Sequence, residues 1–211
     1  ASLKGTKLLL GPDYAPVRDE FTNVAYRVKE QAARVLISTG GSDTYNIAGQ
    51  LLEEFFRQGS ELCFEVVSGA MNPHLSDLNH LAEEHGNITI HSNVRNMAEL
   101  MKECDVAISA GGSTMYELGA VGVPTLCFSF VDNQERLAES FGKKGFAAYM
   151  GNYLENGRQL IRSICTETAE LSEDFEARVN LSRRARGLVD GLGAERIANE
   201  LRKEDCDEEN K

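Results

Sequence analysis

The fold is decided by residues 106–117, which read VAISAGGSTMYE. The pattern predicts a short buried strand, a turn at Gly111 and Gly112, and a short helix after the turn. Glycine has no side chain and therefore lets the backbone come close to a ligand. A helix that starts after such a turn points free N–H groups and the positive end of its dipole into the gap. The stretch therefore predicts a seat for an anionic group such as a phosphate.

The same residues also have a purely structural interpretation. Thr114 and Glu117 have the spacing of a capping box, in which the two side chains satisfy the N–H groups at the helix start. In that case the turn would connect a strand to a helix and bind nothing. At the level of the sequence both interpretations stay open, because a short motif needs its structural context.

Composition and charge limit the classes of protein to which this chain can belong. The chain has 211 residues, 42% of them hydrophobic and 26% charged, which is typical of soluble globular proteins. Its net charge is −11, which argues against nucleic acid and anionic membranes as partners. No apolar run approaches the roughly 18 residues that a transmembrane helix needs. A basic and then apolar leader is not seen either.

The cysteines indicate a reducing compartment. There are five of them, an odd number, and no two have the C-x-x-C spacing. We therefore expect a cytoplasmic protein without a disulfide framework.

Residues 1–33 are expected to form a connector between domains. Residues 7–11 could form a short edge strand. Pro12 and Pro16 then disfavour helix, both at their own positions and at the residues before them.

From residue 34 on, strands and helices alternate. Apolar runs predict strands at 35–38, 62–67, 88–90, 106–110, 125–128 and 146–149, and helical periodicity predicts helices at 46–57, 74–85, 96–103 and 133–142. This order indicates an α/β fold, a doubly wound parallel sheet of about six strands. We expect one Rossmann-like domain over 34–200, with helices from 153 to 204 separated at Gly191 and Gly193. Residues 201–211 are expected to be a disordered acidic tail.

A second glycine turn strengthens the prediction of a ligand site. Gly40 and Gly41 follow the strand at 35–38, so both turns should lie at the carboxyl edge of the sheet, where such folds bind ligands. Two seats on one edge suit a diphosphate or a nucleotide. The hydroxyls of Ser42, Ser113 and Thr114 are expected at helix starts, where they could donate to phosphate oxygens. The alternative is that they only cap helices.

Further candidates follow the glycine turns. Glu117 lies four residues after Ser113 on the same helix face and could accept both hydroxyls of a ribose. Asn133 and Gln134 begin a later helix, and their amides could bind sugar hydroxyls. Capping is the alternative role for all three.

The sequence contains no motif for the other kinds of catalytic or metal-binding site that we considered. The chain has no phosphate loop of the G-x-x-x-x-G-K type and no G-x-S-x-G serine. None of the four histidines has a neighbour at metal-ligand spacing. The only D-x-D pair, Asp205 and Asp207, lies in the acidic end. We therefore expect no metal and no cofactor. The basic cluster at residues 183–186 is expected to be solvated or salt-bridged.

The motifs resemble a known family. Residues 111–126, GGSTMYELGAVGVPTL, followed by Asp132-Asn133-Gln134, resemble the C-terminal half of the two-domain GT-B nucleotide-sugar enzymes. Residues 37–43, ISTGGSD, and the connector 10–21, LGPDYAPVRDEF, are most similar to the PseG-type hydrolase of pseudaminic acid biosynthesis, which removes UDP from a diacetamido-trideoxy-altrose sugar. Spore-coat polysaccharide glycosyltransferase-like proteins and the lipid II-forming N-acetylglucosaminyltransferase are more distant matches. The resemblance covers about residues 8–200.

The resemblance implies roles for the candidates. Glu117 would hold the ribose, and Ser113 and Thr114 the diphosphate. Gly40, Gly41 and Ser42 would face the diphosphate or the sugar, and Asn133 and Gln134 the sugar side. The catalytic histidine of that family lies in a glycine-rich loop of an N-terminal domain, for which we find no counterpart here, so we predict no catalytic residue in this chain. We therefore expect the partners to be UDP or a UDP-sugar and a missing N-terminal domain, against which the helices after 153 would partly pack.

Three functions remain open. The first is the UDP-sugar-binding half of a PseG-type hydrolase, and the second is the donor-binding half of a glycosyltransferase of polysaccharide biosynthesis. In either case this chain alone is expected to be inactive. The third is a nucleotide-binding domain without catalysis.

Overall fold

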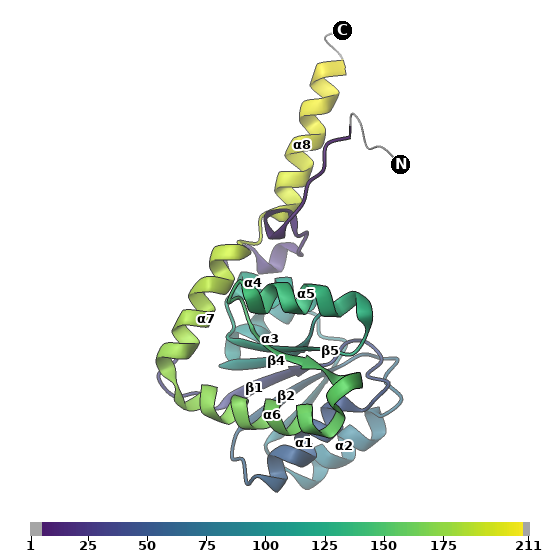
Figure 1. Ribbon diagram of the computed structural model, residues 1–211, viewed down its shortest axis with the longest axis vertical. Helices are drawn as coiled ribbons and strands as arrows, with labels where there is room; N and C mark the ends of the chain where they lie inside the picture. The colour runs from purple at the N-terminus through teal and green to yellow at the C-terminus, as the bar shows by residue number, and fades with distance from the viewer. Residues whose placement is uncertain (1–5, 209–211) are drawn as a thin grey trace.

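The computed structural model describes the backbone of residues 6–208, and the side chains in that range except those of residues 132, 133 and 203–208. A six-stranded sheet lies between two layers of helices (Figure 1). The strands are β1 (Arg34–Ser38), β2 (Cys63–Ser68), β3 (Ile88–Ser92), β4 (Val106–Ala110), β5 (Thr125–Ser129) and β6 (Ala148–Asn152). The helices are α1 (Ile47–Arg57), α2 (Leu75–Glu84), α3 (Met97–Glu103), α4 (Thr114–Val121), α5 (Asp132–Lys143), α6 (Tyr153–Glu173), α7 (Phe175–Leu188) and α8 (Gly193–Glu208).

The sheet is parallel throughout, and its strand order is β3-β2-β1-β4-β5-β6. This confirms the predicted doubly wound α/β fold. The chain direction across the sheet reverses between β1 and β4, which are neighbours, with Ser38 paired to Ser109. The two glycine turns therefore follow adjacent strands and lie at the same carboxyl edge. That position is the switch point at which folds of this kind bind ligands.

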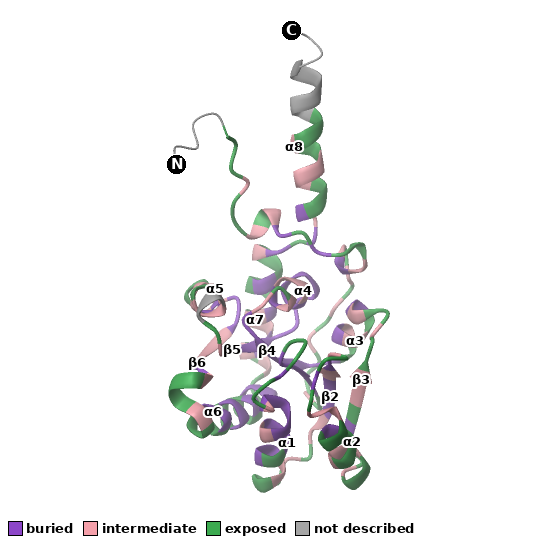
Figure 2. Cartoon of the chain, turned by 90° about the vertical axis from the view of Figure 1, so that its right-hand side faces the viewer, coloured by how far each residue is buried: buried purple, intermediate pink, exposed green. Residues whose placement is uncertain are grey.

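Both faces of the sheet are covered, which explains why the strands are apolar along their whole length. Val35 and Ile37 of β1 pack into the core with α1, α2 and α6, whereas Leu36 packs into the core with α3, α4, α5 and α7. All five residues of β4 are buried. Figure 2 shows the buried residues concentrated in the sheet and on the inner sides of these helices.

The structure corrects three details of the prediction. Residues 6–10 form no strand, because they pair with no strand of the sheet. The last strand begins at Ala148 and not at 146, since Phe146 packs into the core before the strand starts. The acidic end is helical as far as Glu208, consistent with the high helix propensity of Glu, Lys and Arg. Residues 209–211 lie outside the described part.

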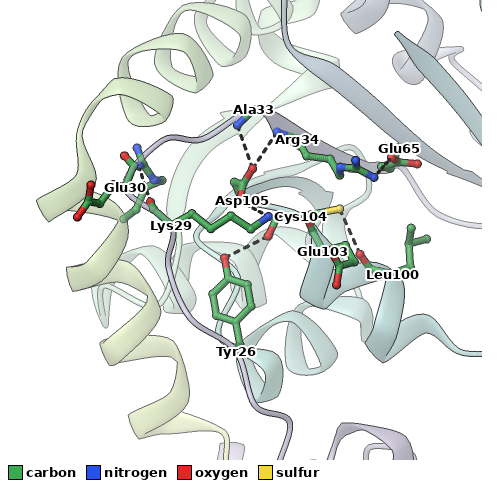
Figure 3. A network of polar contacts seen from close by, with 11 residues as sticks. Tyr26, Lys29, Glu30, Ala33, Arg34, Glu65, Leu100, Glu103, Cys104 and Asp105 are labelled. Atoms are coloured by element: carbon green, nitrogen blue, oxygen red, sulfur yellow. Dashed lines mark hydrogen bonds and ion pairs between the residues drawn. The ribbon is translucent and has the colours of Figure 1, made fainter. Parts of the chain in front are cut away.

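The connector is bound firmly to the domain. It contains two 3-10 turns, η1 (Pro12–Tyr14) and η2 (Asp19–Phe21), and the Phe21 side chain is buried. Its last residues reach the amino-terminal edge of the sheet, where Asp105 precedes β4. One Asp105 oxygen accepts the N–H groups of Ala33 and Arg34 at 2.9 and 3.0 Å, and the other lies 3.0 Å from the Lys29 ammonium (Figure 3).

A buried arginine holds the same segment from the other side. Arg178 of α7 is 0% exposed, and its guanidinium donates to the carbonyls of Leu171 and Ser172 at the end of α6 and of Lys29 and Glu30 in the connector. The carboxyl end of a helix carries partial negative charge, so this position suits a cation. The connector is therefore part of the domain and does not behave as a free linker.

The basic cluster on α7 packs against the ends of other helices. The Arg186 side chain lies against Gly122, which caps the end of α4, and the Arg184 side chain lies against Gly145, just after α5. The Arg184 guanidinium thus lies near the carboxyl end of α5, where positive charge is stabilising, whereas the Arg186 guanidinium donates to the Tyr26 carbonyl of the connector at 3.4 Å.

Helix α8 projects from the body of the domain, with residues 6–11 beside it (Figure 1). Leu8, Leu10 and Leu201 are exposed along this projection. Within the described residues, no helix is both long enough and apolar enough to cross a membrane.

Candidate functional site

The start of α4 is open. Ser113 is the N-cap residue, and its side chain makes no capping hydrogen bond. The N–H groups of Met115 and Tyr116 donate to the carbonyls of Gly112 and Ser113, at 3.2 and 3.0 Å. In the described part of the chain, the N–H groups of Ser113 and Thr114 donate to no acceptor. Two donors and the positive end of the helix dipole therefore face the edge of the sheet, as the prediction of an anion seat requires.

The capping-box interpretation of Thr114 and Glu117 is wrong. Thr114 is the first residue inside α4 and not its cap, so Glu117 lies one position too far along the helix to return to the cap residue. The Glu117 side chain is instead 3.3 Å from Arg18, a residue of the connector.

The second predicted seat, at the start of α1, is already filled. Asp43 is 2% exposed, and its two carboxylate oxygens accept the N–H groups of Ile47 and Ala48 at 2.8 and 3.0 Å. A carboxylate that occupies these donors excludes a phosphate from the same place. The two glycine turns lie on one edge, but Asp43 takes the first two N–H groups of α1, whereas within the described residues the first N–H groups at the start of α4 have no such acceptor.

Ser42 is also misplaced in the prediction. It lies five positions before Ile47, the first residue of α1, and its hydroxyl is 3.4 Å from that of Thr44. The N-cap position of α1 belongs to Asn46, which has a left-handed backbone conformation. Gly40 and Gly41 remain exposed at the sheet edge. These three residues therefore line the edge without forming a helix-end seat.

Glu117 and Arg18 form a charged pair beside the open seat. Glu117 is on α4, one turn after Ser113, and burial raises the pKa of its carboxyl group, while the Arg18 guanidinium opposes that shift. Arg18 is also 2.7 Å from Glu20 and lies over the Phe21 ring at 5.1 Å. Analysis of the sequence missed Arg18, because the proline-rich connector resembled a spacer.

Helix α5 begins directly beside the seat. The Gly111 N–H donates to the Phe128 carbonyl at 2.8 Å, and a Cβ added to Gly111 would come within 2.8 Å of the Ala138 Cβ. Gln134, in the first turn of α5, has a buried side-chain oxygen without a donor among the described residues. The backbone of Asn133 lies in the same turn, and its side chain is outside the description. The structure thus brings the start of α5 next to the start of α4.

This architecture is the Rossmann-like α/β domain of the GT-B fold. The chain matches the family described as "Glycosyltransferase family 28 C-terminal domain" over residues 31–188, and it belongs to that family.

Similar proteins agree with this assignment. The spore coat polysaccharide biosynthesis protein SpsG of Bacillus subtilis is 29% identical over 91% of this chain and 57% of its own length. The UDP-2,4-diacetamido-2,4,6-trideoxy-beta-L-altropyranose hydrolase of Campylobacter jejuni is 29% identical over 64% of this chain and 48% of its own length. In fold, the chain is similar to Acinetobacter baumannii MurG, with a TM-score of 0.62 at 15% identity, over 83% of this chain and 51% of that one. The chain thus spans about half the length of the curated relatives it matches.

Proposed function

We propose that this chain binds a UDP-sugar at the carboxyl edge of its sheet, with the diphosphate at the start of α4. The observation that carries the proposal is the pair of unpaired N–H groups at Ser113 and Thr114, at the switch point of the sheet. The hydroxyls of the same two residues would add donors. Gly40, Gly41, Gly111 and Gly112 would let the backbone come close to the ligand.

Glu117 is the proposed ribose ligand. Its carboxylate lies one turn from the anion seat, and a carboxylate can accept hydrogen bonds from both ribose hydroxyls. Arg18 would keep Glu117 ionised despite its partial burial, since an opposite charge nearby favours the charged form. Asn133 and Gln134 are proposed to contact the sugar from the start of α5.

We further propose that the full-length protein hydrolyses a UDP-linked diacetamido-trideoxy sugar during surface polysaccharide or pseudaminic acid biosynthesis. Support comes from the Campylobacter jejuni hydrolase, whose printed name describes that substrate. The N–H groups and dipole of α4 would stabilise the negative charge that grows on the leaving UDP. A base from another domain would activate the attacking water. The four described cysteines are free, which supports a reducing, cytoplasmic setting.

A glycosyltransferase is the second candidate. It is supported by the family match, whose description names a glycosyltransferase, and by the similarity to SpsG, whose printed name describes spore coat polysaccharide biosynthesis. The donor site would be the same, and an acceptor hydroxyl would replace water.

Both candidates need a further domain, and we propose where it docks. The exposed side chains of Leu8, Leu10 and Leu201 lie on the projection formed by residues 6–11 and α8. Apolar side chains that project together in this way are typical of an interface.

The binding proposal can be tested by calorimetric titration of the chain with UDP and with 2′-deoxy-UDP. We expect Glu117→Gln to weaken UDP binding about tenfold or more, because a hydrogen bond to a charged group contributes about 1.5–3 kcal/mol. The loss should be much smaller for 2′-deoxy-UDP, which lacks one of the two hydroxyls. Glu20→Gln is the matched control, since Glu20 also pairs with Arg18 but lies in the connector. Undiminished UDP binding by Glu117→Gln would rule out the ribose role.

A further inference from the structure

The exposed large hydrophobic side chains of the described chain fall into two groups. One group, Leu8, Leu10 and Leu201, lies on the projection. The other lies at the carboxyl edge of the sheet and consists of Tyr45, Met71, Val131 and Leu154. Tyr45 is 42% exposed, Val131 37% and Leu154 54%. Folds of this kind bind ligands at this edge of the sheet, and exposed apolar side chains that gather there are candidates for contact with a ligand.

One of these edge residues, Tyr45, belongs to an aromatic cluster with Phe130 and Tyr153. The Tyr45 ring is 6.2 Å from the Phe130 ring in a T-shaped arrangement and 5.6 Å from the Tyr153 ring. Tyr45 follows β1, Phe130 follows β5, and Tyr153 opens α6 after β6. With Val131 and Leu154, which adjoin Phe130 and Tyr153 in the chain, these rings form what we call the apolar wall.

The wall is held in place by its surroundings. The Gln50 amide donates to the Tyr45 carbonyl at 2.8 Å and to the Tyr153 hydroxyl at 2.9 Å. Asp43 and Asn46, on either side of Tyr45, both have positive φ angles, 38° and 51°. Asp43 is fixed because its carboxylate accepts the N–H groups of Ile47 and Ala48 at the start of α1. The Tyr45 ring is therefore positioned before any ligand arrives, which lowers the entropic cost of binding.

The wall adjoins the anion seat. The Phe128 carbonyl accepts the Gly111 N–H, and the Phe128 ring is 6.3 Å from the Phe130 ring. Val131 is the N-cap residue of α5, whose first turn lies against Gly111. A group attached to a diphosphate at α4 would thus meet the wall as it leaves the seat along this edge.

We propose that the apolar wall selects the sugar, and that it favours a sugar with methyl or N-acetyl substituents over one that carries only hydroxyls. This inference rests on the proposed function and adds the specificity determinant. Apolar substituents gain from contact with Tyr45 and Leu154, whereas hydroxyls in the same place would lose water without a partner. The Tyr45 ring packs edge-on to Phe130 and is 42% exposed, so in this proposal the ring supplies the apolar contact and its hydroxyl is not required.

The test compares UDP-glucose with UDP-N-acetylglucosamine, which differ in one substituent, and uses UDP as the reference. All three ligands are titrated against the chain by calorimetry. We expect UDP-N-acetylglucosamine to bind about tenfold more tightly than UDP-glucose, the scale on which apolar contacts discriminate. Tyr45→Ser should bring this ratio close to one, whereas Tyr45→Phe should preserve it. Leu10→Ser, which removes an exposed leucine outside the wall, should leave the ratio unchanged.

The outcomes separate the two proposals. If UDP binds but the wild-type chain does not distinguish the two sugars, or if Tyr45→Ser keeps the ratio, the wall has no role in selection and the nucleotide site stands. If UDP itself fails to bind, the proposed function is wrong. Melting curves of the variants show whether a loss arises from unfolding, which is not expected for a side chain that is 42% exposed.

Discussion

At the scale of single residues, Glu117, the proposed ribose ligand, has a cost in stability. Burial raises the pKa of its carboxyl group above the ordinary value of 4.5. A raised pKa in the folded state means that folding favours the protonated form. The stabilising contribution is present below the unfolded pKa and is lost as the pH rises through the folded pKa. At neutral pH, the ionised Glu117 therefore opposes folding.

The raised pKa of Glu117 leads to a prediction about the stability of Glu117→Gln. At pH 7 the variant should be at least as stable as the wild type, because glutamine carries no charge to desolvate. Below pH 4.5 the difference should shrink, since Glu117 is then protonated in both states. Urea denaturation at pH 7 and pH 4 measures both values. A variant that is less stable at pH 7 would indicate that the Arg18 contact outweighs the burial of the charge.

At the scale of elements, two helices follow the same tripeptide and differ in how their first N–H groups are bonded. Gly-Gly-Ser occurs at 40–42 and again at 111–113. The residue that follows decides the outcome. Asp43 folds back and occupies the donors of α1, whereas Thr114 enters α4 and leaves the donors open. An anion seat therefore depends on what caps the helix as much as on the glycines before it.

The glycines of the second turn differ in a testable way. A Cβ on Gly111 would approach the Ala138 Cβ to 2.8 Å, whereas a Cβ on Gly112 would meet nothing within 4 Å. Gly111→Ala should therefore destabilise the chain by about 1–3 kcal/mol through overpacking between the turn and α5. Gly112→Ala, the control, should change the free energy of unfolding by about 0.5 kcal/mol or less. Equal values in urea denaturation would argue against close packing at Gly111.

At the scale of the whole molecule, the chain forms one well-packed domain with a projecting helix. The connector is fastened to the sheet edge by Asp105 and to α6 and α7 by Arg178. Arg18 is thereby held near Glu117, although 99 positions separate them in the chain. A domain attached through this connector would be coupled directly to the proposed ribose ligand.

The activity of the full-length protein distinguishes the candidate functions. Incubated with a UDP-linked diacetamido-trideoxy sugar and no acceptor, a hydrolase releases free sugar and UDP. We expect this result for the full-length protein and no turnover for the 211-residue chain. Release of UDP only when an acceptor is added would favour the glycosyltransferase. Binding of UDP without turnover in either case would favour a domain without catalysis.

The sequence by itself determined the order of strands and helices and the class of sheet, because apolar periodicity and glycine turns are local properties of the chain. It also placed both turns at one edge, since all parallel strands end on the same side. Only the tertiary structure decided that Asp43 closes the start of α1, that Arg18 meets Glu117, and that Tyr45 joins Phe130 and Tyr153. These contacts depend on loop conformation and on packing between distant segments, which no local pattern encodes.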